Sequence, residues 1–407
     1  MLDSGNRPWR YAPSRDGVSW EKPDLGIFDN GGSRANNILA ANRRSKYFNV
    51  FKDPQDSDPA RRYKAMGEIE GRGTSGAAVA FSPDGLRWTE YAGNPVAPKG
   101  REITDSPTLL GWDSRIRKYV YYPRPGFPLA PRINGTGFYR PPQGLNPNVG
   151  QLRSIGYSTS DDFVRWSPTQ LMLAPDELDR ADWQYYQMTA VQKGEYYIGL
   201  MHMMQTHDQT FDIYLLTSID GFHWDWVDRR LPFLKRGDIG SYDAGYLMPS
   251  GPIVHDGTIW IYYGACTGAH SYETNRLGPN HMTIALATLP ADRYVGMLAG
   301  PDLAFLVTRP LIFSGSKLMI DLDASLPDRA SKRPTEREFD EADVRVAVLD
   351  QWGGKIDGFE VERCRMIAES GVQEVSWENA TLGALEGKPV RLRFEYRNAA
   401  LYSLQFS

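Results

Sequence analysis

The chain has only two cysteines, Cys266 and Cys364, among its 407 residues. We therefore expect no disulfide framework, and the cysteine and histidine spacings match no metal-binding motif. No apolar run reaches the roughly 20 residues that a membrane-spanning helix needs. The first residues also lack the charged and apolar regions of a secretory signal. These features predict a cytoplasmic protein without a membrane partner, or a secreted or periplasmic one if a signal segment precedes Met1.

The chain also has little excess charge of either sign. It carries 46 Lys and Arg against 50 Asp and Glu, a formal net charge of -4. Without a basic stripe, we expect no nucleic-acid partner. Aromatic residues, in contrast, make up 12% of the sequence. Both β-rich cores and sugar-binding clefts use such residues. The sequence leaves the oligomeric state open.

A short phrase, Ser-x-Asp-Gly-x-x-Trp, recurs along the first part of the chain. Copies occupy residues 14–20, 82–88 and 218–224, with a looser copy at 160–166. Such repetition indicates that one structural unit was copied. The Asp-Gly pair suits a turn in which Gly adopts a positive φ and Asp caps the backbone. We therefore interpret the phrase as structural, with its Trp packed between neighbouring units and no catalytic role for its Asp.

Strand-like runs rich in β-branched and aromatic residues lie between the copies, separated by Gly, Pro, Asn and Asp. The units cover residues 36–96, 103–173, 182–234 and 241–300, and the chain opens in the middle of another. Their first strands are expected near Asn36–Ile38, Ile103–Ser106, Tyr185–Val191 and Tyr242–Gly245. Four-stranded units of this length are typical of propeller blades. We predict an all-β protein with a five-bladed β-propeller over residues 1–306. Its first blade is incomplete at the N-terminus or completed by residues near 301–320.

The repeat stops at about residue 307. Alternating apolar and polar residues then predict strands at 344–349, 390–396 and 401–406. This pattern predicts an antiparallel β-sandwich over residues 307–407. The charged, proline-containing segment 328–338 is expected to be a loop.

A five-bladed propeller followed by a β-sandwich resembles the glycoside hydrolase superfamily that includes families 32 and 43. The blade phrases carry the resemblance together with residues 308–311, 344–350, 358–359 and 401–406. It implies hydrolysis of an O-glycosidic bond in an oligosaccharide or polysaccharide by carboxylate acid–base chemistry. It implies no redox cofactor and allows a structural Ca²⁺ in the channel. The phrase also resembles the Asp-box of sialidases, with one residue fewer between Asp and Gly.

The catalytic motifs depart from the family 32 pattern. The Asn-Asp-Pro-Asn-Gly nucleophile motif is absent. The nearest match to the Arg-Asp-Pro motif is Lys52-Asp53-Pro54, and neither cysteine follows a Glu as in the family's acid motif. The alternative is therefore a carbohydrate-binding or catalytically inactive propeller.

Members of this superfamily bind their ligands at the mouth of the channel, where the innermost strands begin. Asp105 and Asp243 occupy equivalent starts in two units. Because hydrolysis needs a proton donor and a second carboxylate beside the anomeric carbon, they are the first catalytic candidates. Asp53 and Glu102 are further candidate acids. Each of the four could instead cap a strand, bind water or lie in a solvated loop.

Eight residues at or near the same strand ends are candidates for substrate binding. Arg124 can grip a substrate carboxylate or form a structural ion pair. Tyr186 and Tyr246 can stack on a sugar or belong to the core. The histidines can line the pocket or make ordinary hydrogen bonds. The full set is Asn37, Arg124, Tyr186, Gln187, His202, His207, Tyr246 and His270.

Overall fold

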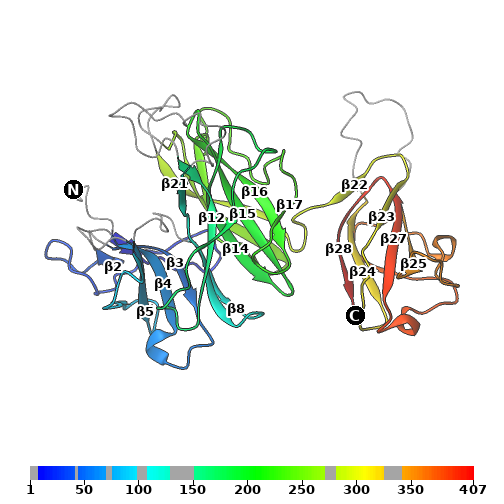
Figure 1. Cartoon of the computed structure of the whole chain (residues 1–407), viewed down its shortest axis with the longest axis horizontal. Helices are drawn as coiled ribbons and strands as arrows, with labels where there is room; N and C mark the ends of the chain where they lie inside the picture. The colour runs from blue at the N-terminus through cyan, green and yellow to red at the C-terminus, as the bar shows by residue number, and fades with distance from the viewer. Residues whose placement is uncertain are drawn as a thin grey trace. The chain divides into compact units, whose positions relative to one another are not determined.

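A computed structural model describes residues 8–41, 45–69, 76–98, 108–128, 151–270, 281–324 and 342–407 (Figure 1). The regular elements in these ranges are strands, apart from 3₁₀ turns of three or four residues, which confirms the all-β fold class. None of the described helices could cross a membrane. The chain divides into two compact units, residues 1–252 with 261–287 and residues 253–260 with 288–407.

The first unit contains successive antiparallel sheets in sequence order. In the first sheet, β3 (Ser45–Lys52), β4 (Tyr63–Ile69), β5 (Gly76–Ser82) and β6 (Thr89–Glu90) pair in turn, with β7 (Ala97–Pro98) also on β5. The second consists of β8 (Thr108–Asp113), β9 (Lys118–Tyr122), β12 (Ile155–Ser160) and β13 (Gln170–Leu173). The third consists of β14 (Trp183–Lys193), β15 (Tyr196–Gln205), β16 (Thr210–Ser218) and β17 (Asp225–Trp226).

A fourth group of strands follows in the same order. It consists of β18 (Tyr246–Pro249), β20 (Thr258–Cys266) and β21 (Met282–Pro290), with β19 (Ile253–His255) also on β20. One parallel bridge, from Phe211 to Tyr246, links β16 to β18. A separate antiparallel pair, β10 (Gly126–Pro128) with β11 (Gln151–Arg153), lies in sequence between β9 and β12 of the second sheet. The predicted four-strand order is therefore present in the first three sheets, whereas in the fourth group β18 begins after the predicted first strand Tyr242–Gly245, which forms a turn.

Hydrogen bonds join the first strands of neighbouring sheets. The Leu109 N–H of β8 donates to Asn49 Oδ1 of β3 over 3.4 Å. Thr108 Oγ1 donates to the Met188 carbonyl of β14 over 2.6 Å. Thr189 Oγ1 of β14 donates to the Pro249 carbonyl of β18 over 3.1 Å. The first strands therefore lie next to one another in sequence order, as expected for a propeller-like arrangement.

The N-terminal residues differ from the prediction. Asn36–Ile38 does not begin the sheet that contains β4, because β3 takes that place. Instead β2 (Ile38–Ala41) pairs with β1 (Pro8–Arg10). Asn37 supports this pairing, since its Nδ2 donates to the Tyr11 carbonyl over 2.7 Å and its own carbonyl accepts from the Tyr11 N–H. Local pairing between the two N-terminal strands thus replaces the predicted inner strand.

The first copy of the phrase packs against the fourth group of strands. The Tyr262 hydroxyl of β20 donates to the Gly17 carbonyl over 2.8 Å, and the rings of Trp20 and Tyr262 lie 5.7 Å apart. The same contact joins the second and third sheets, where the Tyr122 hydroxyl donates to the Gly221 carbonyl over 3.1 Å. The N-terminal segment therefore follows the fourth group in space as each sheet follows the one before it.

Each copy of the phrase forms the same turn. In residues 82–88, Ser82 Oγ accepts from the Gly85 N–H over 2.9 Å, and Asp84 Oδ1 accepts from the Arg87 N–H over 2.7 Å. Gly85 has a φ of 77°. The Arg87 N–H lowers the pKa of Asp84 to about 2. Because the Ser and Asp bonds recur in residues 14–20, 160–166 and 218–224, the structural interpretation is confirmed.

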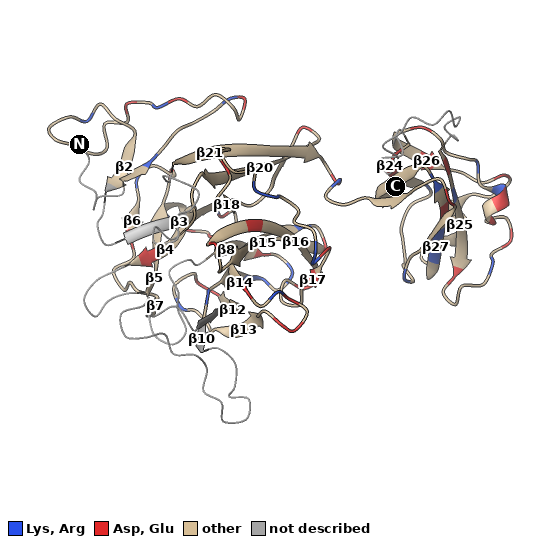
Figure 2. Ribbon diagram, turned by 90° about the horizontal axis from the view of Figure 1, so that it is seen from above, with Lys and Arg blue, Asp and Glu red and all other residues tan. Residues whose placement is uncertain are grey.

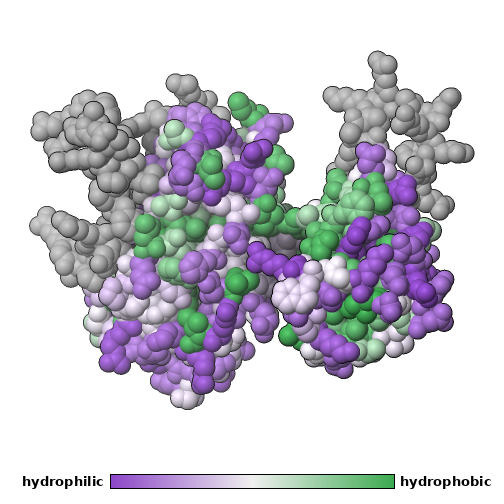
Figure 3. Space-filling view, turned by 45° about the vertical axis from the view of Figure 1, so that its right-hand side comes forward, coloured by the Kyte–Doolittle hydropathy of each residue, from purple (hydrophilic) through white to green (hydrophobic). Residues whose placement is uncertain are grey.

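The second unit is a β-sandwich, as predicted (Figure 2). One sheet has the order β22 (Met297–Ala299), β28 (Ala399–Phe406), β24 (Leu318–Asp323) and β26 (Gly371–Val375). The other has the order β23 (Ala304–Val307), β27 (Val390–Arg397) and β25 (Asp343–Asp350). Alternate residues of β27 are buried in the shared core. Since β23 and β24 belong here, the prediction that residues near 301–320 complete a propeller blade is wrong. The visible surface mixes hydrophilic and hydrophobic side chains (Figure 3).

Candidate functional site

The first strands of the sheets begin where the second strands end, because neighbouring strands run antiparallel. Trp183 at the start of β14 pairs with Gln205 at the end of β15, and Tyr246 at the start of β18 pairs with Cys266 at the end of β20. Six side chains from these strand ends lie together. We call them the mouth cluster: Arg124, Arg153, Tyr186, Phe211, Tyr246 and His270.

A β-bulge places Tyr186 in this cluster. Tyr185 pairs with Met203 and Gln187 pairs with His202, so Tyr186 is the extra residue of β14. A bulge can re-aim a side chain, and bulges are common next to active sites. Here Tyr185 stays in the core formed with the second sheet, while Tyr186 packs among residues of β16, β18 and β20.

Aromatic rings form the buried base of the mouth cluster. Phe211 is completely buried, and Tyr186 and Tyr246 are 6% and 8% exposed. The ring centroids of Tyr186 and Phe211 are 4.6 Å apart, and those of Phe211 and Tyr246 are 5.4 Å apart. The two tyrosines therefore offer little open ring surface for a sugar and instead support the polar groups around them.

Two guanidinium groups lie against the Tyr186 ring. Arg124 Cζ is 4.2 Å from the ring centroid, and Arg124 Nη1 donates to the Tyr186 carbonyl over 3.3 Å. Arg153 Cζ is 5.6 Å from the same centroid, and Arg153 Nη1 donates to Gln184 Oε1 over 2.5 Å. Cation–π attraction favours both placements. Burial and the charge of Arg124 lower the pKa of Arg153.

His270 adds a neutral polar group to the cluster. Its Nε2 lies 3.0 Å from the Tyr186 hydroxyl, and its backbone N–H donates to the Gln209 carbonyl over 2.9 Å. Burial, with the charges of Arg153 and then Arg124, lowers the pKa of His270 to about 4. The imidazole is therefore uncharged near pH 7 and only partly buried.

Asp243 lies in the turn before β18, at the same end of the strands as the mouth cluster. It is half-buried, and its Oδ1 accepts from the Ser241 hydroxyl over 2.7 Å. Burial, Tyr242 and Asp243 raise the pKa of Tyr263, so that phenol stays protonated beside the carboxylate. The other two acids predicted near a strand start, Glu102 and Asp105, lie outside the described residues.

Three of the four remaining predicted ligands, all except Gln187, are engaged elsewhere. Besides Asn37, they are His202, with Nε2 3.3 Å from Thr189 Oγ1, and the exposed His207, with Nδ1 2.6 Å from Asp182 Oδ2. Burial lowers the pKa of His202 to about 3. Gln187 Oε1 and His202 Nδ1 are buried without a hydrogen-bond partner in the described part of the chain.

Asp53 lies at the opposite end of its sheet, where the phrase forms its turn. It is 2% exposed. Its Oδ2 is 2.7 Å from Lys64 Nζ and accepts from the Tyr119 hydroxyl over 2.7 Å, and its Oδ1 accepts from the Gln55 N–H. Lys64 also contacts Asp56 over 2.8 Å. The carboxylate is thus held by a buried ion pair.

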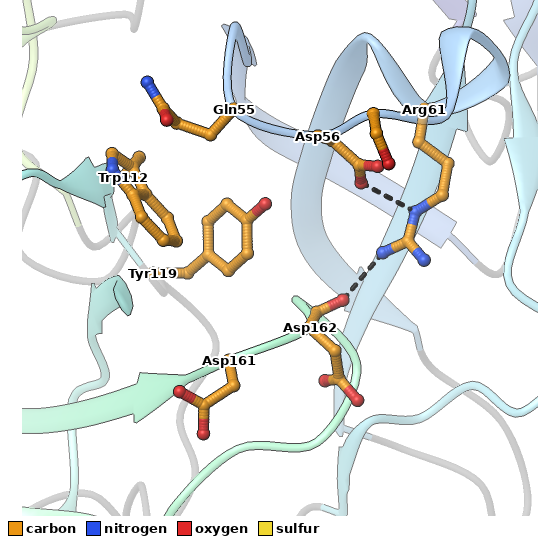
Figure 4. Close-up of a pocket in the computed structure, with 8 residues that line it drawn as sticks. Gln55, Asp56, Arg61, Trp112, Tyr119, Asp161 and Asp162 are labelled. Carbon is orange, nitrogen blue, oxygen red and sulfur yellow. Dashed lines mark hydrogen bonds and ion pairs between the residues drawn. The ribbon is translucent and has the colours of Figure 1, made fainter. Parts of the chain in front are cut away.

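A cavity of about 300 Å³ lies beside this ion pair (Figure 4). Its polar lining is already paired, since Arg61 contacts Asp56 over 3.2 Å and donates to the Asp162 carbonyl over 2.6 Å. Asp161 is paired with Lys118 over 2.7 Å. The Arg61–Asp162 bond connects the first sheet to the second, and these pairs give the cavity a structural setting different from that of the mouth cluster.

No group of three or more His, Cys, Asp or Glu side chains in the described ranges could hold a metal ion. The structural Ca²⁺ in the channel stays a prediction. Cys266 and Cys364 are both buried, and neither is part of a disulfide.

Sequence reasoning did not include Arg153 and Phe211. Arg153 ends β11, two residues before β12, the third strand of the second sheet, while Arg124 follows β9, the second strand of that sheet. These positions lie at the same end, so strand polarity was the signal that could have found Arg153. Phe211 is the second residue of β16, at the equivalent end of the third sheet.

Comparison with known proteins gives only distant likenesses. No family model matches the chain, and no curated protein matches its sequence. A fructofuranosidase from Schwanniomyces occidentalis, solved with fructosylnystose, is similar with a TM-score of 0.40 and 10% identity, over 98% of this chain and 88% of that one. A glycosyl hydrolase from Bacteroides ovatus is similar with a TM-score of 0.39 and 14% identity, over 72% and 78%.

A GH32 β-fructofuranosidase from Bombyx mori has a TM-score of 0.38 and 12% identity, over 91% of this chain and 82% of that one. The chain spans 61% of the length of two further matches, one named as a glycoside hydrolase and the other as an RGII complex. Likenesses with TM-scores below 0.5 carry no assignment of activity or substrate.

Proposed function

We propose that the first unit is a glycoside hydrolase that binds a saccharide at the mouth cluster. The observation that carries this proposal is the convergence of Arg124, Tyr186, Tyr246 and His270 from separate segments at one end of the unit. Polar groups converging over an apolar base are typical of sugar and small-molecule sites. The substrate is an oligosaccharide or polysaccharide.

Asp105 and Asp243 are the proposed catalytic carboxylates. One protonates the leaving oxygen, and the other acts on the anomeric carbon directly or through water. The Ser241 hydroxyl orients the Asp243 carboxylate by donating to it. No redox cofactor takes part in this chemistry.

A screen of aryl glycosides and oligosaccharides tests the proposal. For any glycoside that is cleaved, we expect Asp105→Asn and Asp243→Asn each to lower kcat/KM by about 100-fold or more, because acid–base groups contribute roughly that much. Asp161→Asn is the matched control, since that side chain is 79% exposed beside the cavity of Figure 4. Unchanged hydrolysis in both active-site variants would refute the assignment of these acids.

A carbohydrate-binding protein without catalysis is the second candidate. It is favoured by the contacts of Arg153 and His270, which among the described residues involve amide, aromatic and backbone groups and no carboxylate. Measurable sugar binding without turnover of any glycoside in the screen would support this function over hydrolysis.

A further inference from the structure

Arg153 carries a positive charge at the mouth cluster. Among the described residues no carboxylate lies within ion-pair distance of its guanidinium, which bonds the neutral Gln184 and faces the Tyr186 ring. A buried or half-buried charge is costly unless it is paired. The residue is only half-buried.

The described neighbours of Arg153 add no negative charge beside it. Arg124 lies against the same ring, and its positive charge opposes that of Arg153. His270 is uncharged near pH 7 and so adds a hydrogen-bonding group without an anion. In contrast, the arginine lining the cavity at the opposite end, Arg61, is paired with Asp56. Arg61 therefore has a carboxylate partner in the described chain, whereas Arg153 does not.

The local backbone fixes where Arg153 stands. Arg153 pairs in register with Gly126 of β10, two residues after Arg124, so the two guanidinium groups come from adjacent strand ends. Gln184 and Tyr186 of β14 hold the Arg153 side chain from a different sheet. A guanidinium held in this way is preorganised for a planar anion, which it can bind through two parallel N–H bonds.

We propose that Arg153 is a specificity-determining residue that binds the carboxylate of an acidic sugar. The inference rests on the proposed function and names its substrate class as glycosides of uronic acids. Arg153 supplies the bidentate contact, with Arg124 adding positive charge and His270 an uncharged hydrogen-bonding group beside it. The neutral sugar of the same configuration lacks the planar anion and binds without this contact.

Binding measurements test the inference without requiring turnover. Calorimetric titration with D-glucuronate and D-galacturonate is compared with D-glucose and D-galactose, and galactose 6-sulfate distinguishes a sulfate from a carboxylate. We expect a uronate to bind more tightly than its neutral counterpart. Arg153→Gln should weaken uronate binding about 10- to 100-fold, as loss of a charged hydrogen-bond pair does, and change neutral-sugar binding less than about threefold.

Two further variants separate recognition from folding. Arg153→Lys keeps the charge beside Tyr186 but loses the bidentate fork, so an intermediate uronate affinity is expected. Arg165→Gln removes the same charge from a phrase turn, where the side chain is 89% exposed, and should leave binding unchanged. Equal losses for uronate and neutral sugar, or a preference for the sulfated sugar, would overturn the inference. Cleavage of neutral glycosides with no uronate preference would overturn it while leaving the proposed function intact.

Discussion

Burial determines the protonation of two histidines in the first unit. His202 is 1% exposed and His270 lies among aromatic rings and two arginines, and both pKa values are lowered. The sequence placed both residues at strand ends but could not predict their charge, because that depends on neighbours from other sheets. At neutral pH each side chain is uncharged, so the positive charge of the mouth cluster comes from its arginines.

His202 should make the first unit sensitive to acid. Its pKa is about 3 in the folded chain and 6.5 as the ordinary value, so the unfolded chain takes up a proton first as the pH falls. Stability is then fully present above pH 6.5 and falls by about 3 kcal/mol on acidification to pH 4. His202→Gln should flatten this part of the stability curve measured by urea unfolding.

His223→Gln is the control for the acid sensitivity, because that side chain is 80% exposed in a phrase turn. It should leave the slope between pH 6.5 and pH 4 in place. Equal slopes for the wild type and His202→Gln would show that His202 does not supply the sensitivity.

The end of a first strand is tied to the second strand of the next sheet by an Asp–Tyr pair. Asp53 accepts from Tyr119 over 2.7 Å, and Asp113 accepts from Tyr197 over 2.8 Å. The sequence predicted first strands near Asn36–Ile38 and Ile103–Ser106, not the strands β3 and β8 whose ends carry Asp53 and Asp113. It could not predict that an acid after a strand is buried against a tyrosine from the next sheet, because local periodicity contains no information on contacts between sheets.

The two partners of the buried ion pair should differ in their effect on stability. Lys64→Met leaves the Asp53 carboxylate buried without its cation, and we expect a loss of about 3 kcal/mol or more in the free energy of unfolding. Asp53→Asn should cost about 1 to 2 kcal/mol, because Lys64 retains Asp56 at 2.8 Å. Urea unfolding followed by tryptophan fluorescence measures both changes. A milder effect of Lys64→Met than of Asp53→Asn would contradict this account of the pair.

At the scale of the whole chain, the spacing of the repeated phrase located the successive sheets. The alternation of apolar and polar residues identified the sandwich. The mistaken positions are those where pairing was non-local or where a competing strand was available. β3 took the place expected for Asn36–Ile38, and β23 and β24 joined the sandwich. The β14 bulge that positions Tyr186 was equally unpredictable, since it is defined only by the register with β15.

The first unit carries two polar sites at opposite ends of its strands. The mouth cluster holds Arg153, for which the described residues supply no carboxylate partner, whereas the cavity near Arg61 is lined by acids that are already paired. We therefore propose that the saccharide binds at the mouth cluster and that the other end contributes to stability.

A crystal structure of the protein with a bound sugar tests this placement most directly. The sugar used is the one with the highest affinity in the titrations. The account predicts density for it within hydrogen-bond distance of Arg153 and His270, with the anomeric carbon directed toward Asp243. Density for the sugar only in the cavity lined by Arg61 and Asp161 would contradict it.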